Sequence, residues 1–135
     1  MDSTQLKESK TSSSEAICLV DDDPSVCKAV SRLLESAGFQ VKAFPEPDPF
    51  LKYLEINSVA VAVLDIWMER MTGMELLAHL CARSPATRVI FITGHEDSAA
   101  QATVMQAGAF GFLIKPFDDE IFLNLVGRAF NDGNR

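Results

Sequence analysis

Four of the short apolar runs in this sequence end directly in polar side chains that can take part in chemistry. In chain order these are a group of three carboxylates, a single carboxylate, a hydroxyl and an amine: Asp21-Asp22-Asp23, Asp65, Thr93 and Lys115. Carboxylates that lie close together repel one another, and partial burial increases the cost. A hard cation would offset that repulsion, and Mg²⁺ is typically held by one or two carboxylates together with phosphate oxygens. The acidic residues therefore predict a Mg²⁺ site.

A carboxylate beside Mg²⁺, a hydroxyl and an amine suits phosphoryl transfer. A carboxylate can attack phosphorus and form an aspartyl phosphate. Mg²⁺ and an ammonium group neutralise charge on the group in transfer, and a threonine hydroxyl can donate to a phosphoryl oxygen. The sequence therefore predicts transfer onto Asp65, at a site that also contains Asp21, Asp22, Thr93 and Lys115.

Each of these residues also has a simpler interpretation. The Asp21–Asp23 run suits a helix cap, although one aspartate is enough for that purpose. Thr93 followed by glycine suits a turn, Lys115 suits a solvated surface, and Asp65 suits an ordinary loop. Only the combination of these residues at strand ends favours a reactive site.

The apolar runs themselves predict strands that are buried on both faces of a parallel sheet, because they are short, continuous and rich in Val, Ile and Phe. The five runs cover residues 17–20, 39–43, 59–64, 89–92 and 110–114. Segments with helical spacing alternate with them and cover residues 24–37, 48–56, 73–83, 98–107 and 119–130. This alternation predicts an α/β fold, a (βα)5 doubly wound five-stranded parallel sheet with helices on both faces. Functional groups gather at the carboxyl edge of such a sheet, where all the candidate residues fall.

Local signals mark the ends of several of these helices. Asp23 is placed to cap the first one, and Pro24 suits its first turn. Gly38 suits a left-handed ending. Thr72 and Glu75 have the spacing of a capping box.

Length and composition predict one domain at residues 16–131 in a chain of 135 residues. Residues 1–15, rich in Ser, Thr and Lys, predict a disordered N-terminal tail rather than a signal peptide, and residues 132–135 a short C-terminal tail. The net charge of −7 argues against direct nucleic-acid binding. No apolar run approaches the roughly 20 residues that cross a bilayer, so we expect no membrane span. Cys18, Cys27 and Cys81 predict buried free thiols, in keeping with a cytoplasmic location.

Taken together, the motifs resemble the receiver domain of two-component response regulators. They read V-D-D-D-P, V-L-D-I-W-M, F-I-T-G-H and L-I-K-P-F, in the order and at the spacing typical of receivers. The resemblance implies the flavodoxin-like strand order 2-1-3-4-5. It also implies a signalling switch rather than a conventional enzyme, namely a phosphoprotein of phosphorelay signal transduction.

The resemblance assigns Asp65 as the phosphoacceptor, with Mg²⁺-dependent self-phosphorylation and self-dephosphorylation. Asp21 and Asp22 would hold the Mg²⁺ together with Asp65, and Trp67 would offer its backbone carbonyl to the metal.

The resemblance also implies how phosphorylation is sensed. Thr93 would bond to the phosphoryl oxygen after transfer, and Lys115 would pair with the phosphoryl group. Phe112 would act as the aromatic rotamer switch, and the Lys115–Pro116 peptide bond is expected to be cis.

The implied phosphodonor is a histidine kinase or a phosphotransfer protein. The face made by helix 98–107, strand 110–114 and helix 119–130 would then change shape, and a homodimer through this face is a further implication. The cognate kinase and the output are left open, as is the choice between a stand-alone receiver and part of a longer regulator or hybrid kinase.

Two departures from the family pattern, and a histidine near the site, affect the region above Asp65. Glu69 stands where proline is common, so loop shape and local charge should differ. Trp67 is bulky for a position beside the phosphoryl group, and His95 lies close to the site. Both side chains are hypothesised to limit the access of water to the phosphoryl group.

Three other classes of protein share parts of this pattern. A phosphatase with an aspartate nucleophile would carry an acidic residue where Trp67 stands. A pseudo-receiver usually has a degraded site, whereas every site residue is intact here. A flavodoxin-like cofactor binder shares the fold, but no Gly-rich phosphate loop is present in the sequence.

Overall fold

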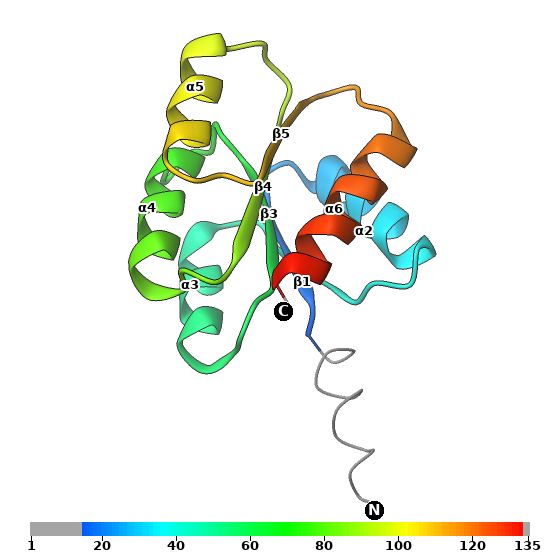
Figure 1. The fold of residues 1–135 in the computed structure, drawn as a ribbon, viewed down its shortest axis with the longest axis horizontal. Coiled ribbons are helices and arrows are strands. Elements are labelled where there is room, and N and C mark those ends of the chain that lie inside the picture. The colour runs from blue at the N-terminus through cyan, green and yellow to red at the C-terminus, as the bar shows by residue number, and fades with distance from the viewer. Residues whose placement is uncertain (1–14, 134–135) are drawn as a thin grey trace, which may run out of the picture.

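The computed structural model describes residues 15–133 of the protein (Figure 1), so predicted tail residues 1–14 and 134–135 lie outside it. The strands are β1 (Ile17–Val20), β2 (Val41–Phe44), β3 (Val61–Asp65), β4 (Arg88–Thr93) and β5 (Gly111–Ile114). The helices are α2 (Pro24–Ser36), α3 (Pro47–Ile56), α4 (Gly73–Arg83), α5 (Ser98–Gln106) and α6 (Asp119–Gly133). Strands and helices alternate as predicted.

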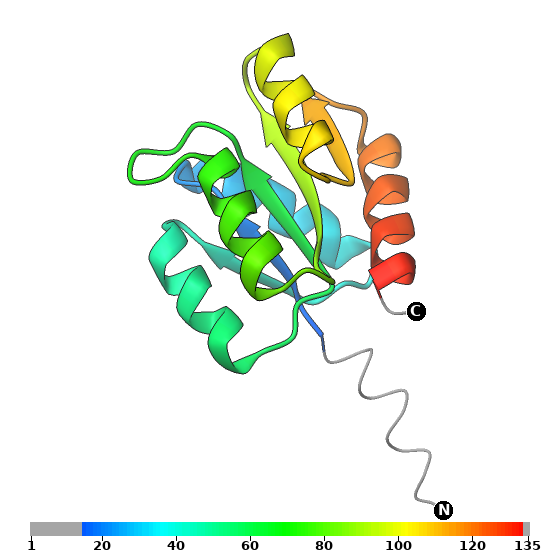
Figure 2. The ribbon, with the colours of Figure 1, turned by 60° about the vertical axis from the view of Figure 1, so that its left-hand side comes forward.

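All five strands are parallel and form one sheet in the order β2-β1-β3-β4-β5, which confirms the expected order. Helices α3, α4 and α5 cover one face of the sheet, and α2 and α6 cover the other (Figures 1 and 2). The chain is therefore doubly wound, with the carboxyl ends of the strands at a common edge.

Each face of the sheet has its own apolar core, because successive strand residues point to opposite faces. In β1, Cys18 and Val20 belong to the cluster beneath α3, α4 and α5, whereas Ile17 and Leu19 belong to the cluster beneath α2 and α6. All four side chains of β1 are fully buried. The two-sided burial that the continuous apolar runs predicted is thus confirmed at the centre of the sheet.

The second strand begins two residues later than predicted. The Phe39 N–H donates to the carbonyl oxygen of Leu34 at 3.1 Å, so it still belongs to the C-terminal turn of α2. Gly38 makes this turn possible with a φ of 94°, in the left-handed region that glycine favours. At the other end of the chain, α6 runs to Gly133, beyond the predicted helix end at Phe130.

The predicted helix caps are present. The Asp23 side chain accepts a hydrogen bond from the Ser25 N–H at 2.9 Å at the start of α2. At the start of α4, Thr72 Oγ1 accepts from the Glu75 N–H at 3.1 Å, and Glu75 Oε1 accepts from the Thr72 N–H at 2.9 Å. Both caps lie at the carboxyl edge of the sheet, where they fix the helices that flank the acidic residues.

Gly73, the first residue of α4, packs against the end of β3. A Cβ atom at this position would overlap the backbone carbonyl oxygen of Asp65 and lie 2.8 Å from Cε1 of Phe91. The Gly73 N–H also donates to the carbonyl oxygen of Ile66 at 2.7 Å. Only glycine allows the helix to begin this close to Asp65.

We expect Gly73→Ala to lower the free energy of unfolding by about 1 to 3 kcal/mol, since the new methyl group forces backbone apart in a packed region. Urea denaturation measures this change. Gly127→Ala is the matched control, because nothing lies within 4 Å of an added Cβ there, and alanine in a helix is favoured over glycine by roughly 0.5 to 1 kcal/mol. Equal stability of the Gly73→Ala variant and wild type would contradict the close approach.

The cysteine prediction is correct for Cys18 and wrong for Cys81. Cys18 is buried in β1, Cys27 is half-buried and Cys81 is exposed. Cys81 follows the buried Leu80 in α4, and one further residue turns a helical side chain away from the core. Among residues 15–133, no helix combines the length and apolar character needed to cross a bilayer.

Candidate functional site

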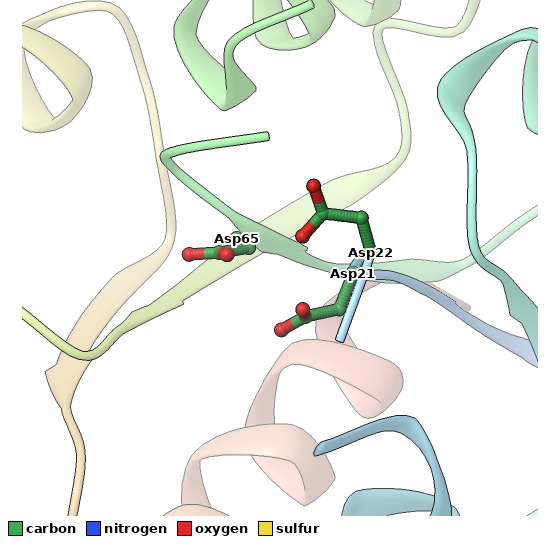
Figure 3. A group of neighbouring side chains, drawn as sticks. All are labelled: Asp21, Asp22 and Asp65. Atoms are coloured by element: carbon green, nitrogen blue, oxygen red, sulfur yellow. The ribbon is translucent and has the colours of Figure 1, made fainter. Parts of the chain in front are cut away.

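Three carboxylates meet at the carboxyl edge of the sheet. Asp21 and Asp22 follow β1, and Asp65 is the last residue of β3. Because β1 and β3 pair directly, with Val20 opposite Leu64, the residues after them lie side by side. One carboxylate oxygen from each aspartate lies within 4.8 Å of the other two, and the three side chains project to the same side of the strand ends (Figure 3).

Asp21 is fully buried and incompletely bonded. Its Oδ1 accepts the Asp23 N–H at 2.9 Å, but its buried Oδ2 has no hydrogen-bond partner among residues 15–133. The Lys115 ammonium lies 3.6 Å from Oδ2. Burial, opposed by that hydrogen bond and by Lys115, raises the pKa of Asp21. A buried oxygen without a partner carries a desolvation cost that a bound cation would remove.

The ionisation of Asp65 is strongly perturbed by its surroundings. Burial raises its pKa to about 6, and the charge of Asp21 acts in the same direction. Lys115 and the backbone N–H groups of Trp67 and Ile66 lower this pKa, but they do not cancel the increase. The group therefore holds its negative charge at an electrostatic cost.

The structure divides the run of three aspartates between two tasks. Asp23 caps α2, and its hydrogen bonds to Ser25 lower its pKa. Asp21 and Asp22 instead belong to the acidic group with Asp65. Helix capping therefore accounts for one residue of the run and leaves the other two for a different purpose.

The acidic group fits a divalent cation. Three carboxylates, one with a buried unpartnered oxygen, are the hard oxygen ligands that Mg²⁺ prefers. Asp22, which is exposed, leaves room for the water ligands that Mg²⁺ usually keeps.

Thr93 and Lys115 end the neighbouring strands at the same edge. Thr93 is 1% exposed, and its carbonyl oxygen accepts the Lys115 N–H at 2.7 Å. The Thr93 Oγ1 accepts the N–H of His95, an exposed residue, at 3.4 Å. Phe112 is half-buried and packs against the core beneath α3, α4 and α5. The Lys115–Pro116 peptide bond is cis, as expected.

The segment between β3 and α4 reaches over the acidic group. Trp67 is 44% exposed. The Glu69 N–H donates to Asp22 Oδ2 at 3.2 Å. The sequence analysis did not predict this hydrogen bond. Glu69 itself was the available signal, because a proline at residue 69 would have no N–H to donate.

A family model described as the response regulator receiver domain matches residues 17–126 of the chain. The chain belongs to this family. The match covers all five strands and the whole acidic group, so the site described above lies within the receiver.

Individual relatives agree with this assignment. The receiver is 36% identical over 113 residues to the transcriptional regulatory protein FixJ of Bradyrhizobium diazoefficiens, a match that covers 84% of the receiver chain and 55% of FixJ. A receiver domain structure from Clostridium thermocellum has a TM-score of 0.83 at 27% identity, covering 89% and 97% of the two chains. The BeF3-activated DrrB receiver domain has a TM-score of 0.78 at 32% identity, covering 87% and 97%.

The chain spans only part of the curated relatives. It covers 51% of the response regulator TmoT, 26% of the transcriptional regulator DctD and 55% of FixJ. The relatives are therefore longer proteins, in which the receiver is one portion.

Proposed function

We propose that this receiver accepts a phosphoryl group on Asp65 from a phosphohistidine of a histidine kinase or a phosphotransfer protein. The observation that carries the proposal is the meeting of Asp21, Asp22 and Asp65, in which Asp21 has a buried oxygen with no hydrogen-bond partner in the described part of the chain. Asp21, Asp22 and Asp65 would hold Mg²⁺ together with the Trp67 backbone carbonyl. When bound, Mg²⁺ supplies positive charge that stabilises the phosphoryl oxygens during transfer.

In the transfer step an Asp65 carboxylate oxygen attacks the phosphorus. A new O–P bond forms as the N–P bond of the phosphohistidine breaks, and the electron pair returns to the imidazole. No base is required, because the nucleophile is already a carboxylate above its pKa of about 6. Lys115, 3.6 Å from Asp21 Oδ2, is close enough to the acidic group to pair with the incoming phosphoryl oxygens.

Phosphorylation then changes the neighbouring strand ends. The Thr93 hydroxyl donates to a phosphoryl oxygen, and Phe112 turns inward. These movements alter the face made by α5, β5 and α6, which includes exposed Met105 and Ile114 and which would carry a homodimer. The added phosphoryl charge thereby shifts the face made by α5, β5 and α6 between two conformations.

The wider setting follows from the relatives. FixJ and DctD are named as transcriptional regulators, so the receiver at residues 16–131 would control an output of that kind within a cytoplasmic two-component system. The receiver itself would not contact nucleic acid, since its net charge is −7.

Intact-mass measurement after incubation with acetyl phosphate tests this proposal. One phosphoryl adduct with Mg²⁺, and none without it, would support a working receiver. If no adduct formed, the protein would be either a receiver that accepts phosphate only from its cognate donor or a pseudo-receiver. Binding of beryllofluoride with Mg²⁺ would distinguish the two, since a pseudo-receiver would fail to bind it. The BeF3-activated DrrB receiver, 32% identical, makes this probe appropriate.

We expect Trp67→Ala to shorten the half-life of the phosphorylated receiver severalfold, because Trp67 carries a large side chain, 44% exposed, on a backbone whose N–H is bonded to Asp65, where the side chain would limit the approach of water. His95→Ala should act in the same direction, because it removes the exposed imidazole of a residue whose backbone N–H donates to Thr93 Oγ1 at this edge of the sheet. Loss of the adduct over time, followed by intact mass, measures both. Unchanged half-lives in both variants would rule out shielding.

A further inference from the structure

The segment between β3 and α4, residues 66–72, is closed at its base by a backbone hydrogen bond and is attached to the acidic group in its middle. At its base the Gly73 N–H donates to the carbonyl oxygen of Ile66 at 2.7 Å. In its middle the Glu69 N–H donates to Asp22 Oδ2 at 3.2 Å, between residues 47 positions apart in the chain. In Figure 2 this green segment lies beside the blue start of α2.

Asp22 depends on such a contact more than its neighbours do. Asp21 is held by burial and by the Asp23 N–H, whereas the Asp22 side chain is exposed. An exposed carboxylate is free to rotate, and ordering it on binding a ligand costs conformational entropy. The Glu69 N–H reduces that cost, because it already holds one carboxylate oxygen of Asp22 in place.

The same contact closes one wall of a hollow of about 240 Å³ that lies next to the acidic group. Its lining residues come from the ends of β1, β2 and β3: Asp22, Pro45, Glu46, Pro47, Met68, Glu69 and Arg70. Two further carboxylates beside Asp22 make this hollow acidic, and Arg70 is itself drawn to Asp48 at 3.8 Å. The Glu69 side chain therefore adds negative charge at the rim of the candidate metal site.

We infer that the backbone N–H of Glu69 is a positioning group for the metal, which holds Asp22 ready for Mg²⁺ and couples ion binding to closure of the 66–72 segment. This inference rests on the proposed function. Proline, common in the family at this position, could not supply the N–H. By linkage, the coupling works in both directions, so bound Mg²⁺ stabilises the closed segment by the same factor.

A Mg²⁺ titration of the full chain distinguishes the effect of the Glu69 backbone N–H on Mg²⁺ affinity from the effect of the Glu69 side-chain carboxylate. Trp67 is the single tryptophan of the chain and lies two residues from Asp65, so its fluorescence reports binding. Glu69→Gln and Glu69→Ala keep the N–H, whereas Glu69→Pro removes it. We expect Glu69→Pro to bind Mg²⁺ about three- to tenfold more weakly than Glu69→Ala, as the loss of one net hydrogen bond predicts. Equal affinities of these two variants would overturn the inference.

Hydrogen exchange of the Glu69 amide in metal-free protein tests the contact without a proline. Asp22→Ala should speed exchange of this amide severalfold, and the Gly73 amide, bonded to Ile66, should keep its rate. An unchanged Glu69 rate would overturn the inference. Added Mg²⁺ should slow exchange of the Glu69 amide in wild type. If wild type fails to bind Mg²⁺, both the proposed function and the metal role of Glu69 are overturned. If wild type binds Mg²⁺ and the Glu69→Pro and Glu69→Ala variants bind it with equal affinity, only the role of Glu69 is overturned.

Discussion

Asp65→Asn is expected to abolish the phosphoryl adduct that we expect the wild-type receiver to form with acetyl phosphate and Mg²⁺. The amide oxygen of asparagine is a poor nucleophile, and the substitution also removes one of the three carboxylates that would hold the ion. The side chain keeps its size, so the packing at the end of β3 should persist. Intact mass after a fixed incubation measures the difference.

The matched control is Asp119→Asn, which removes a carboxylate from the first turn of α6, outside the acidic group. This variant should form the adduct to the wild-type extent. An adduct that persists on Asp65→Asn would place the acceptor on another residue and contradict the proposed role of Asp65.

The same substitution should stabilise the metal-free protein. Burial and the charge of Asp21 raise the pKa of Asp65 from 3.8 to about 6 in the folded state. Between these values Asp65 binds more protons in the folded protein than in the unfolded chain, so its contribution to wild-type stability falls as the pH rises from about 4 to 6. At pH 8 the penalty is complete, and about two pKa units correspond to roughly 3 kcal/mol. Asp65→Asn removes this penalty.

Urea denaturation in the presence of a chelator at pH 4 and pH 8 checks this expectation. The free energy of unfolding of Asp65→Asn should exceed that of wild type by about 2 to 3 kcal/mol at pH 8, and the two should converge near pH 4. The lowered pKa of Asp23 acts in the opposite direction, but it is common to both proteins and cancels in the comparison. Equal stability at pH 8 would show that Asp65 is not under electrostatic strain.

Magnesium should reduce this difference in stability. An ion that binds only the folded state stabilises it in proportion to its occupancy, and wild type has the complete acidic group. The advantage of Asp65→Asn at pH 8 should therefore shrink as Mg²⁺ is added.

The parts of the fold that follow from local sequence were predictable. The run Ile17–Val20 coincides with β1 residue for residue, because continuous apolar residues leave few alternatives to a central strand. The meeting of Asp21 and Asp65 was also predictable, since parallel strands share one carboxyl edge. The early start assigned to β2 was wrong, because Phe39 completes the turn of α2 through a backbone hydrogen bond to Leu34.

The parts that depend on contacts between distant loops were not predictable. Asp22 and Glu69 are separated by 47 positions, and no periodic pattern reports a backbone N–H that points at a side chain. The position of Lys115 beside Asp21 is of the same kind, because a long side chain settles wherever charge and space allow. Sequence motifs therefore predicted which residues gather at the carboxyl edge of the sheet, whereas the structure was needed to show which of these residues contact one another.

The contrast between fully buried Asp21 and exposed Asp22 has one more consequence. One side of the acidic group, at Asp21, is buried in the protein, and the other side, at Asp22, is exposed to solvent. An ion held there would keep its outward water ligands, as Mg²⁺ tends to do, and would leave or enter without any opening of the sheet. Its occupancy would then follow the free Mg²⁺ concentration of the surroundings. Readiness to signal would be set by an exchangeable ion from the environment, with no permanently sequestered metal.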